Sequence, residues 1–132
     1  MNPQRNILVL GALFAALSVV IGAFAAHGLK HHLGIEALGW IDTGVQYQQL
    51  HSLGLILIAI IWHQHPSWNG LKWSAGCMAA GIIFFSGSLY TMAASDIRAF
   101  GMVTPIGGVA FLISWSLLAI TAWRGTHNDR NT

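Results

Sequence analysis

Four long stretches of the sequence lack charged side chains, and this feature limits the fold more than any other. The first runs from Ile7 to Ala26, with Ser18 as its only polar side chain and Arg5 just before it. A helix needs about 20 mostly apolar residues to cross about 30 Å of hydrocarbon. The chain is 55% apolar and only 8% charged, whereas a soluble domain is about 25% charged. We therefore expect an all-α integral membrane protein.

The stretches predict a four-helix bundle in one membrane domain, residues 1–132, with spans at 7–26, 44–62, 73–94 and 100–123 and a polar tail at 124–132. Thr43 followed by Gln46 resembles a capping box, so we expect the second helix to begin at Gly44. Pro105 costs least if the fourth helix begins near Thr104.

The end of the first stretch, AFAA at residues 23–26, resembles a signal-peptidase site. A signal peptide, however, has an apolar region of only about 7–15 residues. The run here is longer, and three more spans follow it. We therefore expect the first helix to remain in the protein as a membrane span.

An even number of spans places both termini and the loop 63–72 on one side of the membrane. That side carries four basic residues: Arg5, Lys72, Arg124 and Arg130. The opposite side has two basic residues and three acidic ones: Lys30, Arg98, Glu36, Asp42 and Asp96. The positive-inside rule then predicts cytoplasmic termini in a bacterial inner membrane, with Trp62, Trp73 and Trp123 as an interfacial belt.

Small residues recur at helical spacing in three of the spans. Helices in lipid associate where small side chains let their backbones approach. The first helix has such a line at Gly11, Ala15, Ser18, Gly22 and Ala26. The third and fourth helices offer Gly76, Ala80, Gly87, Gly101 and Gly108. These lines predict close helix–helix packing, although glycine is also simply common in membrane helices.

The topology gathers polar side chains on the non-cytoplasmic side. The predicted cluster consists of His27, Lys30, Tyr47, His51, Ser86, Tyr90, Asp96, Arg98 and Thr104. Two interpretations stay open: a structural polar network, or a ligand or proton site. If the cluster is functional, His51 is the best titrating candidate, because imidazole changes charge near neutral pH.

Other chemistries find little support in the pattern. A zinc or iron site needs three or four convergent ligands, and only His27 and His51 are candidates within the membrane, so neither a metal nor a cofactor is expected. The lone Cys77 cannot form an internal disulfide.

The basic residues are scattered rather than clustered, which argues against nucleic-acid binding. Ser86 and Ser88 have no His or Asp at helical spacing, so we do not expect an enzyme.

Four segments also resemble a known family, the small bacterial inner-membrane proteins classed as domain of unknown function 423, or the YgdD-like group, with relatives in animal mitochondria. The segments are GAFAAHGLK from Gly22, QYQQLHSLGL from Gln46, GIIFFSGSLY from Gly81 and TPIGGVAFLISW from Thr104. The likeness covers about Ile7 to Trp123.

The resemblance implies a four-helix inner-membrane protein but no established reaction. Its motif positions coincide with His27, His51, Ser86, Tyr90, Thr104 and Pro105. The loop HHLGIEALGWIDTG departs from the motifs, so Glu36, Trp40 and Asp42 inherit no role from it.

Two functions are therefore considered. The first is a non-enzymatic accessory bundle in the lipid bilayer, which forms a homo-oligomer or docks on a larger membrane complex. Short loops leave no room for a soluble catalytic domain. The second is a small carrier or binder of a proton, a quinone or another small molecule through His27, Tyr47, His51 and Tyr90. This second function requires an internal cavity lined by His51.

Overall fold

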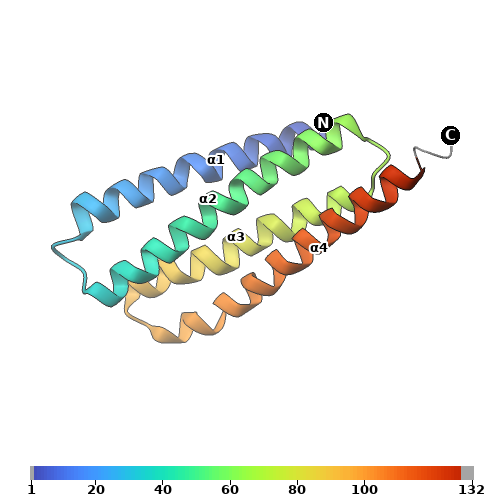
Figure 1. The fold of residues 1–132 in the computed structure, drawn as a ribbon. Coiled ribbons are helices and arrows are strands. Elements are labelled where there is room, and N and C mark those ends of the chain that lie inside the picture. The colour runs from blue at the N-terminus through green and yellow to red at the C-terminus, as the bar shows by residue number, and fades with distance from the viewer. Residues whose placement is uncertain (1, 129–132) are drawn as a thin grey trace.

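The computed structural model describes residues 2–128, which form four long helices joined by short connections (Figure 1). The elements are α1 (Pro3–Phe24) with a π-helical turn after it (η1, Ala25–Leu29), α2 (Ile35–Gln64), α3 (Gly70–Ser95), a 3-10 turn (η2, Arg98–Met102) and α4 (Thr104–Asn128). All four long helices are apolar enough to cross a bilayer. Residues 2–128 contain no strand, and the predicted all-α membrane fold is confirmed.

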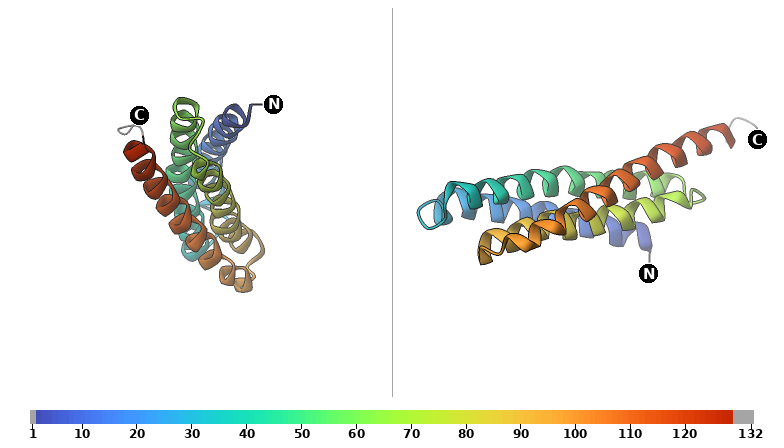
Figure 2. Two further views of the ribbon diagram at one scale, coloured as in Figure 1. Left: turned by 90° about the vertical axis from the view of Figure 1, so that its right-hand side faces the viewer. Right: turned by 90° about the horizontal axis from the view of Figure 1, so that it is seen from below.

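Both described chain ends lie at the same end of the bundle (Figures 1 and 2). Successive helices run in opposite directions, so the connection between α2 and α3 is also at this end, which we call the terminal end. The other end, called the loop end, carries the α1–α2 and α3–α4 connections. Arg130 and the last part of the predicted tail lie outside the described residues.

α2 begins at Ile35 rather than at the predicted Gly44. The Thr43 hydroxyl donates to the Gly39 carbonyl, 3.0 Å away within the same helix, and so it does not cap a helix start. The added turns are held by apolar contacts, because Ala37, Trp40 and Ile41 join a cluster with residues of α1 and α3. α4 begins at Thr104, four residues after the start expected at Phe100, and this places Pro105 in its first turn, where proline costs least.

The helices pack in chain order, α1 on α2, α2 on α3 and α3 on α4. In the most apolar 18 residues of each span, 50% of the residues are buried in α2 and 44% in α3. The corresponding shares are 11% in the span of α1 and η1 and 17% in the span of η2 and α4. Figure 2 shows α1 and α4 apart in the end-on view. The larger apolar core lies between α2, α3 and α4 around Leu55, Met78 and Phe111.

The small residues of α1 face α2 along most of the predicted line. A Cβ added to Gly11 would lie 2.9 Å from Ile56 Cγ1 and 3.0 Å from the Ser52 carbonyl oxygen. Ser18 is fully buried, and Gly22 lies against Val45. Along the same line, Ala15 is half-buried, whereas Ala26 in η1 is exposed.

The close glycines between α3 and α4 are not those the spacing predicted. Gly87 has no neighbouring atom within 4 Å of an added Cβ, and at Gly108 the nearest is a Phe85 ring carbon at 3.9 Å. The close contacts occur at Gly81, which meets the Phe111 ring, and at Gly107, which meets the Phe85 backbone. Of the two glycines predicted to pack, Gly108 thus makes an ordinary contact with Phe85, whereas Gly87 makes none within the bundle.

Candidate functional site

A buried glutamine joins the first three helices in the half of the bundle nearer the loop end. Gln48 is 2% exposed. Its side-chain NH2 donates to the Phe14 carbonyl on α1 at 2.8 Å, and its Oε1 accepts from the Tyr90 hydroxyl on α3 at 2.8 Å. Both ends of the amide are thus paired, which offsets the cost of burying it.

A second contact beside Gln48 fixes how closely α2 and α3 approach. The Ser86 hydroxyl donates to the Gly44 carbonyl on α2 at 2.7 Å. Gly44 has no side chain, and an added Cβ would lie 2.6 Å from Tyr90 Cε1. The glycine therefore makes room for the tyrosine ring, and the hydroxyl of that ring reaches Gln48. We call Gln48, Ser86, Tyr90 and Gly44 the buried polar network.

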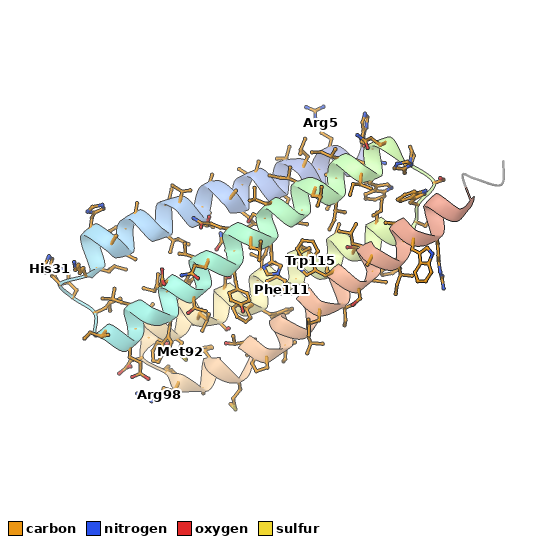
Figure 3. All side chains as sticks on the ribbon, viewed as in Figure 1. Arg5, His31, Met92, Arg98, Phe111 and Trp115 are labelled. Atoms are coloured by element: carbon orange, nitrogen blue, oxygen red, sulfur yellow. The ribbon has the colours of Figure 1, made fainter. Side chains whose placement is uncertain are left out.

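His51 lies in a stack of aromatic rings between α2 and α4. Its ring centroid is 3.4 Å from that of Phe111, and Tyr47 stacks on Phe85 at 4.3 Å. Trp115 completes the group at 6.1 Å from His51. Figure 3 shows Phe111 and Trp115 directed from α4 toward α2. The close stacking fills the space next to the imidazole with side chains.

The polar contact of His51 is local. Nδ1 lies 2.6 Å from the Tyr47 carbonyl oxygen one helical turn earlier. A carbonyl only accepts, so this contact requires a proton on Nδ1. Because His51 is 4% exposed and packed against rings, this arrangement gives no support to the carrier function.

The remaining predicted residues lie in separate places. His27 and Lys30 are exposed at the end of α1, and Lys30 lines a hollow of about 330 Å³ between α1 and α2 that also contains Asp42. No hydrogen bond within residues 2–128 joins His27 to His51 or Tyr90. The Thr104 hydroxyl pairs with that of Ser88 at 2.7 Å, between α3 and α4.

At the loop end, Asp96 and Arg98 have structural roles. Asp96 ends α3 with a positive φ of 57°, a conformation that commonly closes a helix. Arg98 forms an exposed ion pair with Glu36 at 2.8 Å and lies near the Trp40 ring. The structure thus divides the nine predicted residues among the buried polar network, the aromatic stack, the α3–α4 contact and the loop-end surface.

Metal ligands do not converge in the described part of the chain. Among residues 2–128, no three His, Cys, Asp or Glu side chains come close enough to hold one ion. The buried polar network offers amide and hydroxyl groups that already bind one another, and no buried side-chain nitrogen or oxygen among these residues lacks a partner. The arrangement can hold helices together, because its buried polar atoms are paired with one another.

Gln48 is the residue that the sequence analysis missed. The signal was present in the spacing of the buried positions on α2, which follow a pattern of four and three residues: Ile41, Val45, Gln48, Ser52, Leu55, Ala59 and Trp62. A glutamine on such an apolar seam must find a partner inside the bundle. Searching the seam for polar interruptions would have identified it.

Comparison with known proteins agrees with this description. The family described as "Protein of unknown function (DUF423)" matches residues 21–108. The UPF0382 inner membrane protein YgdD of Escherichia coli strain K12 is 40% identical over 92% of this chain and 92% of its own length. The UPF0382 membrane protein YwdK of Bacillus subtilis strain 168 is 41% identical over 90% of this chain and 97% of its own.

No solved structure matches the chain. The family match covers α2 and α3 completely and the adjoining ends of α1 and α4. The relatives align over nearly their whole length, so the resemblance seen in the four sequence segments is confirmed. With its four spans, the chain belongs to the DUF423 family and is an integral protein of the inner membrane.

Proposed function

We propose that the chain is a non-enzymatic membrane protein that acts by assembling with a second copy of itself through the outer face of α3. The interior supports this proposal because its polar groups bind one another. Function is then expected on the outer faces of the helices.

One observation carries the proposal: a line of small residues on α3 points away from the core. Gly76, Ala80, Gly87 and Ala94 recur at spacings of four and seven, so they share one helix face. Gly76 and Gly87 have nothing within 4 Å of an added Cβ. Small side chains of this kind permit close backbone contact with another membrane helix.

The outer face of α2 provides the contrast. Its outward side chains are large: Leu50, Leu53, Leu57 and Ile60, each between 45% and 61% exposed. Such side chains are well suited to lipid tails. α3 is a central helix like α2. Its outer face also has large exposed side chains at Trp73, Ile83 and Phe84, but the small residues Gly76, Ala80 and Gly87 lie beside them. A second helix gains more from this face than lipid does.

A second copy is the occupant we favour. The outer face of α3 carries no charge between Trp73 and Ala94, so its partner must be apolar. In a two-fold symmetric dimer, the same face of α3 from each copy forms the interface. The line of small residues on one copy therefore packs against the identical line on the other. Membrane proteins of other kinds are the competing occupants.

The test is disulfide crosslinking in native membranes. In a Cys77→Ser background, Gly87→Cys should give a crosslinked dimer on mild oxidation, because the two copies of residue 87 would face each other. Leu50→Cys, on the outer face of α2 and 57% exposed, is the matched control and should stay monomeric. Equal crosslinking of the two variants, or crosslinks from Gly87→Cys to another protein alone, would refute assembly through α3.

We also propose that the terminal end faces the cytoplasm. Arg5, Lys72 and Arg124 are at this end, and Lys30 and Arg98 are at the loop end together with Glu36, Asp42 and Asp96. Basic residues accumulate on the cytoplasmic side of short-loop membrane proteins, which supports this orientation.

A further inference from the structure

A groove runs between the first turns of α1 and the last turns of α2 at the terminal end. Its volume is about 370 Å³. Polar side chains form its outer rim, namely Asn2, Gln4, Arg5, His63 and Gln64. Its floor, one to two turns farther into the membrane, is apolar and consists of Leu8, Ala59 and Ile60. The groove is therefore polar at the membrane surface and apolar toward the hydrocarbon.

The rim is cationic and contains no acidic residue. Arg5 projects from α1 near the end of α2 (Figure 3). The ion pair present within residues 2–128 joins Arg98 to Glu36 at the loop end, so no described carboxylate neutralises Arg5. Arginine presents a planar fork of donors that fits a phosphate. Asn2, Gln4 and Gln64 line the same groove and carry amide donors.

The hollow at the loop end of the same helix pair shows why this charge matters. There the single cation, Lys30, shares the lining with the carboxylate of Asp42. A ligand in that hollow meets both signs of charge, and an anion gains little. The two hollows lie between the same two helices and have similar apolar walls, but only the groove at the terminal end has unopposed positive charge.

We propose that this groove is a binding site for an anionic phospholipid. The headgroup phosphate binds Arg5 and the polar rim, and one acyl chain lies along Leu8, Ala59 and Ile60. Basic pockets between membrane helices are suited to anionic headgroups. The apolar floor selects a lipid over free phosphate, because a phosphate ion makes no use of it. The site does not depend on the proposed function, since it involves α1 and α2 and leaves the outer face of α3 free.

The test measures lipid selectivity of the whole chain in vesicles of phosphatidylcholine. Spin-labelled phosphatidylglycerol and spin-labelled phosphatidylcholine report the relative association of each lipid with the protein. The wild type should prefer phosphatidylglycerol, and Arg5→Gln should reduce that preference about fivefold, the effect of one basic residue near a charged lipid surface. Lys72→Gln is the matched control, because Lys72 is an exposed cation at the same end but outside the groove. It should retain most of the preference.

Two further measurements separate the alternatives. Leu8→Trp fills the groove without changing its charge and should also abolish the preference, whereas Leu17→Trp, on exposed α1 surface away from the groove, should not. Inorganic phosphate, added at constant ionic strength, should leave the preference unchanged. Equal losses in Arg5→Gln and Lys72→Gln would indicate general surface charge and overturn the proposal. Displacement of the lipid by phosphate would overturn it in favour of an anion site.

Discussion

At Gly107, α4 lies directly against the backbone of α3, and replacing this glycine by alanine tests how these helices are held. An added Cβ would lie 2.7 Å from Phe85 Cα and still closer to its backbone nitrogen. A backbone atom cannot rotate away as a side chain can, so α4 must move. At the adjacent Gly108 the nearest atom is 3.9 Å away, in the Phe85 ring. The same substitution at two neighbouring positions therefore has two different consequences.

The size of the effect follows from these distances. To bring the added Cβ to an ordinary contact of 3.4 Å from Phe85 Cα, the helices must separate by about 0.7 Å at Gly107, and by more to clear the nearer backbone nitrogen. That movement also stretches the Ser88–Thr104 and Ser74–Ser114 hydrogen bonds across the same interface. Overpacking of this kind costs about 1–3 kcal/mol. Alanine gains up to about 1 kcal/mol of helix propensity at either position, so Gly107→Ala should be about 1–3 kcal/mol less stable than Gly108→Ala.

The assay is reversible unfolding in mixed micelles, in which the fraction of sodium dodecyl sulfate is raised and tryptophan fluorescence is followed. The chain has six tryptophans, including Trp115 beside the α3–α4 interface. The transition of Gly107→Ala should come at a lower detergent fraction than that of Gly108→Ala. If the two variants unfold together, or Gly107→Ala unfolds later, the close approach at Phe85 does not exist in the protein.

Two other predictions concern the buried polar network and the orientation. Gln48→Leu removes the hydrogen bonds to Phe14 and Tyr90 and should lower the free energy of unfolding by about 1 kcal/mol in the same assay, since such bonds contribute about 0.6 kcal/mol each in membranes. In the Gln48→Leu background, Tyr90→Phe should then cause almost no further loss of stability. Fully additive losses would contradict the hydrogen bond between the two side chains. A green fluorescent protein fused to the C-terminus should fluoresce and an alkaline phosphatase fused there should be inactive, because we place the termini in the cytoplasm; the opposite pair of results would refute the orientation.

The sequence was sufficient to predict the number of spans and the common side of the termini, because charged side chains are costly in hydrocarbon and their positions along the chain therefore mark the ends of the spans. It was not sufficient for the start of α2. Thr43 and Gln46 match a capping pattern, but Thr43 bonds back to Gly39 within a helix that has already begun. Residues 35–43 stay helical because Ile41 and its neighbours pack against α1 and α3, and tertiary contacts of this kind leave little trace in local sequence.

The polar cluster failed to assemble for a related reason. Placing residues in the same half of the membrane does not say which way each helix face turns. Tyr47 and His51 face Phe85 and Phe111, whereas the Tyr90 hydroxyl turns toward Gln48. The rotation of each helix about its own axis is determined by packing. On α2, the four- and three-residue spacing of the buried positions indicated which face turns inward.

The glycines of α3 connect the fold to the proposed assembly. Gly81 and Gly87 are six residues apart, which places them about 120° from each other around the helix. One faces the Phe111 ring inside the bundle, and the other has open space outside it. A helix that needed glycine only for internal packing could carry a large apolar residue at position 87, as α2 does at Leu50 and Leu53. The space that Gly87 leaves next to the exposed Ile83 is what favours a second helix, rather than lipid, against this face. Assembly through α3 would also leave the groove of Arg5 and His63 on α1 and α2 open to the surrounding membrane in both copies.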